Sequence, residues 1–114
     1  MLPREYRLRH DKDIKTLFAK SKSVFGIYVG IKFTKNKLDV SRFAVVVGTK
    51  VSKKAVDRNR LKRQVRAIIH ERLGDITPGF DVMLLVRKEA VGHTYEELEA
   101  QLVKALTKAK LLKV

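Results

Sequence analysis

The spacing of hydrophobic residues along this chain predicts an alternation of helices and strands. Residues 12–20 repeat apolar side chains at i, i+3 and i+4, which is typical of a short amphipathic helix, and Asp11 stands where a cap is expected. Residues 23–34 and 42–50 are rich in β-branched and aromatic side chains and predict two strands. The second of these runs is almost continuously apolar, which predicts a strand covered on most of both faces. The short connection between the two strands predicts an antiparallel pair.

The second half of the chain continues the alternation. Residues 55–73 predict a long amphipathic helix that Gly74 ends as a C-terminal cap. Residues 80–88 predict a further strand, and Thr94 opens a last helix in which Glu97 has capping-box spacing. The order of helix, two or three strands, helix, strand and helix predicts an α/β (α+β) two-layer sandwich, in which helices pack on a small mixed sheet. The length fits a single domain, residues 1–114.

Charge narrows the range of functions. The chain carries a net charge of +14 and has a pI near 10.3, more than solubility requires, so we expect a polyanionic partner. Nucleic acid is favoured, and an anionic membrane surface is the alternative. No apolar run approaches the roughly 18 residues of a membrane span, and the amino-terminal residues lack an apolar signal core. Together with the absence of cysteine, these features predict a cytoplasmic protein.

Half of the net charge lies in residues 50–72, where nine Lys or Arg face two acidic residues, giving +7. At about 100° per residue, one arc of the predicted helix is apolar and is expected to pack on the sheet. This arc consists of Leu61, Val65, Ile68, Ile69 and Leu73. The opposite side carries Asn59, Lys62, Arg63, Arg66 and His70. A solvated charged face usually mixes signs, whereas this one is nearly all positive and favours a surface for RNA or DNA phosphates.

The connector before this helix is also basic. Lys50, Lys53 and Lys54 surround Ser52, and such a loop can lay amide and ammonium groups along a nucleic-acid backbone. The alternative is an ordinary charged connector.

Catalysis by the protein itself has little support in the sequence. The three histidines, His10, His70 and His93, show no metal-ligand spacing, and cysteine is absent. The acidic residues Asp11, Asp13 and Asp57 are explained as caps and first-turn charges. No phosphate-binding GxxxxGK[ST] or GxGxxG motif occurs. We therefore expect no catalytic or metal-binding residue in this chain, and chemistry that belongs to a partner.

The basic helix also carries a family resemblance. The segment AVDRNRLKRQVR follows a strand and a lysine-rich loop, and in this context the chain resembles the protein subunit of bacterial ribonuclease P. The resemblance covers nearly the whole chain, because LPREYRLRHDKDIKTLFAK is similar to the family's opening, DVMLLVRKEA to its last strand and TYEELEAQL to its final helix. It implies a fold like the second domain of ribosomal protein S5.

The resemblance also implies a function. Proteins of this family bind a large catalytic RNA and the 5′ leader of precursor tRNA, and they assist the endonucleolytic removal of that leader. The RNA performs the chemistry with Mg²⁺, and the protein is expected to be a monomer within a 1:1 ribonucleoprotein. The alternatives are a structural RNA-binding protein of ribosomal type, without a catalytic partner, and a metal-dependent nuclease that acts alone.

Site residues follow from matching positions. The residues expected to contact the catalytic RNA are Lys50, Lys53, Lys54, Arg58, Asn59, Arg60, Lys62, Arg63 and Arg66. Those expected to bind the leader, between the first helix and the open sheet face, are Ile14, Phe18, Tyr28 and Lys32. Aromatic and cationic side chains on a sheet face suit single-stranded nucleic acid, while the alternative for Phe18 and Tyr28 is core packing. This chain differs from many relatives at Ile14, where they carry a second Phe, and at Ser52 and Lys53, where they carry Gly-Asn.

Overall fold

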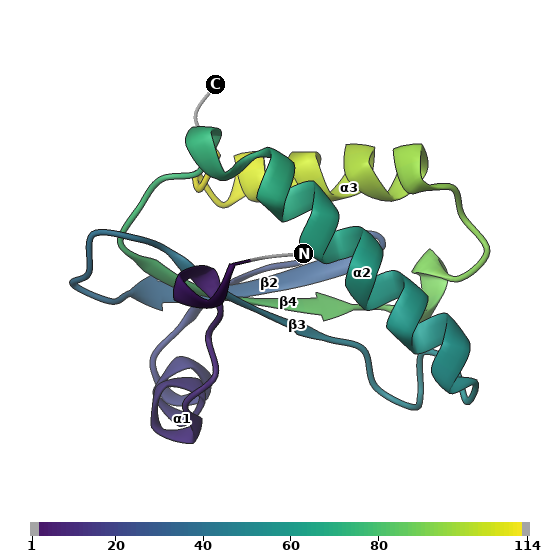
Figure 1. Ribbon diagram of the computed structural model, residues 1–114, viewed down its shortest axis with the longest axis horizontal. Helices are drawn as coiled ribbons and strands as arrows, with labels where there is room; N and C mark the ends of the chain where they lie inside the picture. Colours follow the sequence, from purple (N-terminus) through teal and green to yellow (C-terminus); the bar gives the residue numbers. More distant parts are fainter. Residues whose placement is uncertain (1–2, 113–114) are drawn as a thin grey trace.

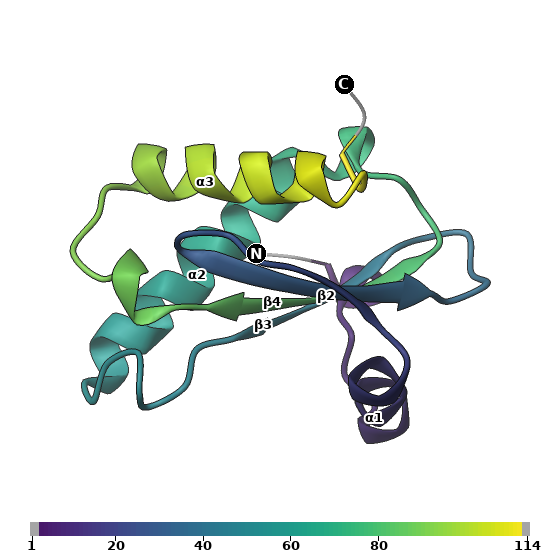
Figure 2. The ribbon, with the colours of Figure 1, turned by 180° about the vertical axis from the view of Figure 1, so that it is seen from behind.

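The computed structural model describes residues 3–112 and shows a four-stranded sheet with helices on both faces (Figure 1). The helices are α1 (Asp11–Ala19), α2 (Ala55–Glu71) and α3 (Tyr95–Lys108), and the strands are β1 (Lys22–Val24), β2 (Val29–Lys35), β3 (Arg42–Val46) and β4 (Phe80–Val86). Three short 3₁₀ turns lie at Arg4–Tyr6, Leu73–Asp75 and Lys88–Ala90. Helices α2 and α3 lie side by side on one face of the sheet, and α1 lies on the other (Figures 1 and 2). No helix within residues 3–112 is long and apolar enough to cross a membrane.

The sheet is mixed, with the strand order β1-β2-β4-β3. Strand β4 lies between β2, to which it is antiparallel, and β3, to which it is parallel. The sequence predicted that the strand within residues 23–34 pairs with the strand within residues 42–50. This prediction is wrong, because β4 lies between β2 and β3. Strand β4 takes the central position because its apolar side chains are buried on both faces of the sheet, and α2 forms the crossover that a parallel neighbour requires.

The segment predicted as one strand over residues 23–34 forms a hairpin of two strands. β1 and β2 pair in antiparallel fashion, with Val24 opposite Ile31, and the chain reverses over residues 25–28. A Cβ atom on Gly26 would lie 2.5 Å from the carbonyl oxygen of Val29, so this reversal requires a glycine. Phe25 is 76% exposed at the turn, which explains why an apolar pattern alone did not reveal the break.

The main core lies between the sheet and the two helices α2 and α3. The arc predicted from helical periodicity is confirmed for Leu61, Val65, Ile68 and Ile69, which are all buried. The capping box of α3 is also confirmed, since Thr94 Oγ1 accepts a hydrogen bond from the Glu97 amide and the Glu97 carboxylate accepts one from the Thr94 amide. A smaller core cluster on the opposite face consists of Leu8, Leu17 and Met83, with Ile14, Ala44 and Leu85 packed against it.

Three predictions about element ends are wrong. Asp11 is the first residue of α1 rather than its cap, and His10 takes the N-cap position without a side-chain hydrogen bond. Helix α2 ends at Glu71, and Gly74 lies in the following 3₁₀ turn. The strand predicted over residues 42–50 is shorter, because β3 ends at Val46. The side chain of Val46 is exposed, since the short helix α1 covers only part of this face of the sheet.

Candidate RNA-binding surface

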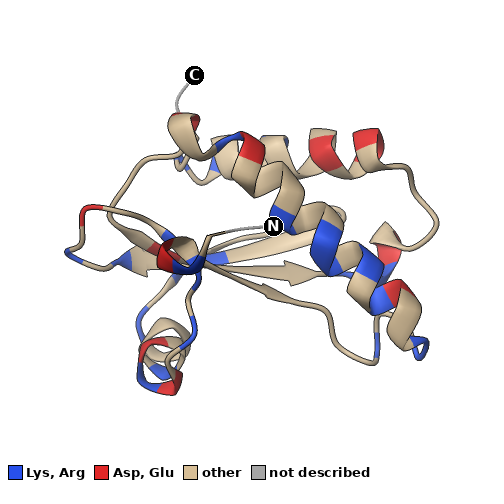
Figure 3. Ribbon diagram, viewed as in Figure 1, with Lys and Arg blue, Asp and Glu red and all other residues tan. Residues whose placement is uncertain are grey.

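The nine residues predicted to contact RNA lie together on α2 and on the loop that leads into it. We call this set, Lys50, Lys53, Lys54, Arg58, Asn59, Arg60, Lys62, Arg63 and Arg66, the α2 basic surface. All nine are exposed or half-buried. Figure 3 shows lysine and arginine positions gathered along the amino-terminal half of α2 and the loop before it. The ion pairs found within residues 3–112 involve Arg42, Arg72, Arg87 and His93, so no cation of this surface is neutralised by a carboxylate in that range.

The loop before α2 is held by Ser52. The Ser52 hydroxyl donates to Asp57 Oδ2 at 3.1 Å and accepts from the Lys54 amide at 3.2 Å. Arg58 Nη1 donates to the Ser52 carbonyl oxygen at 2.8 Å, which folds this guanidinium back toward the loop. Lys54 occupies the N-cap position without a side-chain hydrogen bond. The partial positive charge of the helix N-terminus adds to the potential of the α2 basic surface, and Asp57 in the first turn offsets part of it.

A second group of predicted residues lies where α1 meets the opposite face of the sheet. Phe18 is 57% exposed, and Lys32 Nζ lies 5.6 Å from the centroid of its ring, a cation–π geometry. Ile14 is half-buried against the small cluster around Leu17. We call Ile14, Phe18 and Lys32 the α1–sheet surface. The exposure of Phe18 excludes the alternative that its ring is an ordinary core side chain.

Tyr28 does not join the α1–sheet surface. Its ring stacks on His93 with the centroids 4.5 Å apart, and its hydroxyl lies 3.2 Å from His93 Nδ1. It also packs against the main core, on the side of α2 and α3. The expectation that Tyr28 lies beside Phe18 is wrong, because the break at residues 25–28 places it before β2 rather than on the strand face that carries Lys32.

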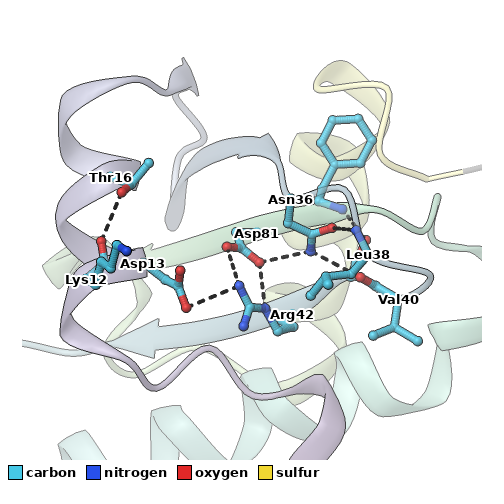
Figure 4. A network of polar contacts seen from close by, with 10 residues as sticks. Lys12, Asp13, Thr16, Asn36, Leu38, Val40, Arg42 and Asp81 are labelled. Atoms are coloured by element: carbon cyan, nitrogen blue, oxygen red, sulfur yellow. Dashed lines mark hydrogen bonds and ion pairs between the residues drawn. The ribbon is translucent and has the colours of Figure 1, made fainter.

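A polar network that the sequence did not reveal fixes α1 to the sheet (Figure 4). Arg42 Nε and Nη2 donate to the two carboxylate oxygens of Asp81 at 2.8 Å each, and Nη2 also lies 3.3 Å from Asp13 Oδ2 on α1. Asn36 Nδ2 donates to Asp81 Oδ1 at 2.9 Å and to the Val40 carbonyl oxygen at 3.1 Å. The hydrogen bonds to Asp81 raise the pKa of Arg42 above its ordinary value. The network therefore holds the helix that carries Phe18.

Within residues 3–112, no three His, Asp or Glu side chains converge as a metal site would require. Asp13 and Asp81 both pair with Arg42.

The protein combines a mixed α+β fold with a cationic helix face that forms no ion pair within residues 3–112. On the other side of the sheet, the exposed ring of Phe18 lies beside Lys32. Together these features are typical of nucleic-acid-binding proteins. A family model described as Ribonuclease P matches residues 2–110, and the chain belongs to this family. A relative from Synechocystis sp. named "Ribonuclease P protein component" is 37% identical over 112 residues, covering 97% of this chain and 90% of the relative.

Solved structures agree with this assignment. The ribonuclease P protein of Thermotoga maritima is 34% identical and superposes with a TM-score of 0.82, covering 90% of this chain and 96% of that one. That of Staphylococcus aureus is 26% identical with a TM-score of 0.87, covering 95% and 98%. The chain thus has the role of the protein subunit of ribonuclease P, a ribonucleoprotein endoribonuclease of tRNA processing. A structural protein of ribosomal type is not favoured.

Proposed function

We propose that this chain binds the catalytic RNA of ribonuclease P through the α2 basic surface, and the 5′ leader of precursor tRNA through the α1–sheet surface. One protein joins one RNA in the cytoplasm, and the RNA cleaves the substrate with Mg²⁺. The observation that carries the proposal is the α2 basic surface, whose eight cations have no carboxylate partner within residues 3–112.

The α2 basic surface suits a folded RNA because it is rigid. Its cations stand on a helix whose other side is anchored by fully buried residues such as Val65 and Ile68. Little conformational freedom of the backbone is therefore lost on binding, and each phosphate contact releases condensed counterions. Without an anion, the like charges at Lys62 and Arg66 repel one another, which favours the bound state further.

The α1–sheet surface suits a single strand of RNA. An exposed aromatic ring stacks with any base, and a neighbouring ammonium group pairs with the backbone phosphate. Phe18 provides the ring and Lys32 the ammonium group, and Lys32 Nζ lies 5.6 Å from the centroid of the ring. Ile14 adds an apolar side chain where many relatives carry a second ring, so this surface holds a base by packing rather than by a second stack.

We assign no chemical step to the protein. Mg²⁺ held by the RNA would activate the attacking water and stabilise the leaving oxygen. The protein's cations lower the concentration of Mg²⁺ that the RNA requires, because they screen phosphate repulsion at the places where they bind.

Reconstitution tests the proposal. Precursor tRNA is incubated at low Mg²⁺ with a bacterial ribonuclease P RNA, with this protein, and with both. We expect cleavage to the mature 5′ end only with both components. Cleavage by the protein alone would assign the chemistry to this chain, and equal cleavage by the RNA alone would remove the need for it. Binding to ribosomal subunits instead of the catalytic RNA would favour the ribosomal alternative.

Replacing Phe18 tests the leader site. We expect Phe18→Ala to weaken binding of precursor tRNA to the assembled enzyme by about 1–3 kcal/mol, the contribution of one stacked base. Binding of mature tRNA should not change, and the free energy of unfolding should change by less than about 1 kcal/mol because the ring is largely exposed. Leu38→Ala, which truncates an exposed apolar side chain in the turn before β3, serves as the control. An equal loss with mature tRNA would contradict the assignment.

A further inference from the structure

A groove of about 790 Å³ lies at the end of the sheet where β2 stops, beside the C-terminal end of α3. Its volume is within the range of known ligand sites, about 300–1,000 Å³. Five of its lining residues are lysines, Lys20, Lys22, Lys35, Lys108 and Lys110. The apolar part of the lining includes Val24, Phe80 and Ala109, and no acidic residue lines the groove. We call it the lysine groove.

Helix dipoles explain only part of this charge. The lysines come from the connection after α1, from β1, from the end of β2 and from the end of α3. Lysine near a helix C-terminus is ordinary, since each helix end carries about half a negative charge. The ends of α1 and α3 together offset about one of the five positive charges. Because no ion pair within residues 3–112 includes any of these lysines, about four charges remain to attract an anion.

Lys110 adds a backbone observation. Its amide donates to the Thr107 carbonyl oxygen and the Leu111 amide to the Leu106 carbonyl oxygen, the two hydrogen bonds of a Schellman motif. The φ angle of Lys110 is 62°, the left-handed conformation in which glycine is usual at this position. A lysine here costs stability in the free protein, which a role in binding would account for.

The mixed lining of the groove suits single-stranded RNA. Apolar side chains take up a base, and the surrounding ammonium groups pair with phosphates. The lining begins at Ala19 and Lys20, directly after Phe18 on the α1–sheet surface, and lies at the other end of the molecule from the amino-terminal end of α2 (Figures 1 and 3). We propose that the lysine groove binds the distal part of the precursor tRNA leader, continuing the strand held at Phe18. This inference rests on the proposed function.

The test uses the assembled enzyme and precursors with a short and a long leader. In Lys35→Gln/Lys108→Gln, two phosphate contacts are removed while the fold is expected to persist, since both side chains are exposed. We expect affinity for the long leader to fall on the order of tenfold at low salt, with a decrease of about 1.4 in the salt slope, and affinity for the short leader to stay unchanged. Lys37→Gln/Lys104→Gln, two exposed lysines outside the groove, is the control with the same net charge.

Each outcome decides between the two proposals. An unchanged affinity for the long leader in the groove variant, with a loss in Phe18→Ala, overturns the lysine groove and leaves the proposed leader site standing. An equal loss for both leader lengths, or in binding of the catalytic RNA alone, assigns the groove to that RNA and overturns the inference. If neither variant nor the unaltered protein distinguishes precursor from mature tRNA, both proposals fail together.

Discussion

Replacing Arg60 and Arg63 together by glutamine is expected to weaken binding to ribonuclease P RNA by tens-fold at low salt. Both residues are exposed on the α2 basic surface, and neither forms an ion pair within residues 3–112, so the change removes charge without disturbing the core. Each lost phosphate contact should reduce the dependence of log K on log salt concentration by about 0.9, giving a decrease of about 1.8 for the pair. Filter binding or calorimetry over a series of salt concentrations measures both quantities.

The control for this variant is again Lys37→Gln/Lys104→Gln, which lowers the net charge equally at positions away from α2. If both pairs reduced the affinity and the slope alike, the binding would depend on overall charge rather than on this helix. Circular dichroism of Arg60→Gln/Arg63→Gln should match the unaltered protein, because glutamine has a helix propensity close to that of arginine.

Removal of the Asp81 carboxylate should strongly destabilise the fold near the leader site. The Asp81 side chain is 7% exposed and that of Arg42 18% exposed, and Asp81→Ala leaves the guanidinium with only Asp13 as a partner. Breaking a buried ion pair costs about 3–5 kcal/mol, and we expect about 3 kcal/mol here because Arg42 keeps one partner and some contact with water. A decrease in Tm of about 10–20 °C should accompany this loss.

Two further variants separate the ion pair from general effects of substitution. Asp39→Ala, at an exposed aspartate in the same region, should change the free energy of unfolding by less than about 0.5 kcal/mol. Arg42→Met/Asp81→Leu should recover most of the lost stability, since replacing both partners leaves no unpaired buried charge. An Asp81→Ala variant as stable as Asp39→Ala would show that the network does not hold α1 in place.

The local features of the fold could be predicted because they depend on residues close in sequence. The buried arc of α2 follows from 3.6-residue periodicity, and the capping box at Thr94 and Glu97 from a spacing of three. The same periodicity predicted that Lys62, Arg63 and Arg66 lie opposite this arc, and in the structure none of the three is buried. The family resemblance rests on short contiguous motifs, AVDRNRLKRQVR above all, so it too could be recognised before any tertiary contact was known.

Pairing between distant strands could not be predicted in this way. Arg42 and Asp81 are 39 residues apart in sequence and become neighbours only because β3 and β4 are parallel in a register that places them side by side. The apolar run of residues 23–34 indicated a strand. Whether such a run forms a hairpin, a bulged strand or a single strand depends on what covers each face of the sheet. For this reason the position predicted for Tyr28, beside Phe18, was wrong.

The sequence by itself determined the basic helix, its buried arc, the family and the need for a polyanionic partner, because each depends on composition or on spacing within one element. The tertiary structure decided that β4 lies at the centre of the sheet, that Asp81 holds Arg42 and α1, and that five lysines from separate segments surround one groove. These outcomes depend on the free energy of burying whole faces against one another, which no local pattern contains.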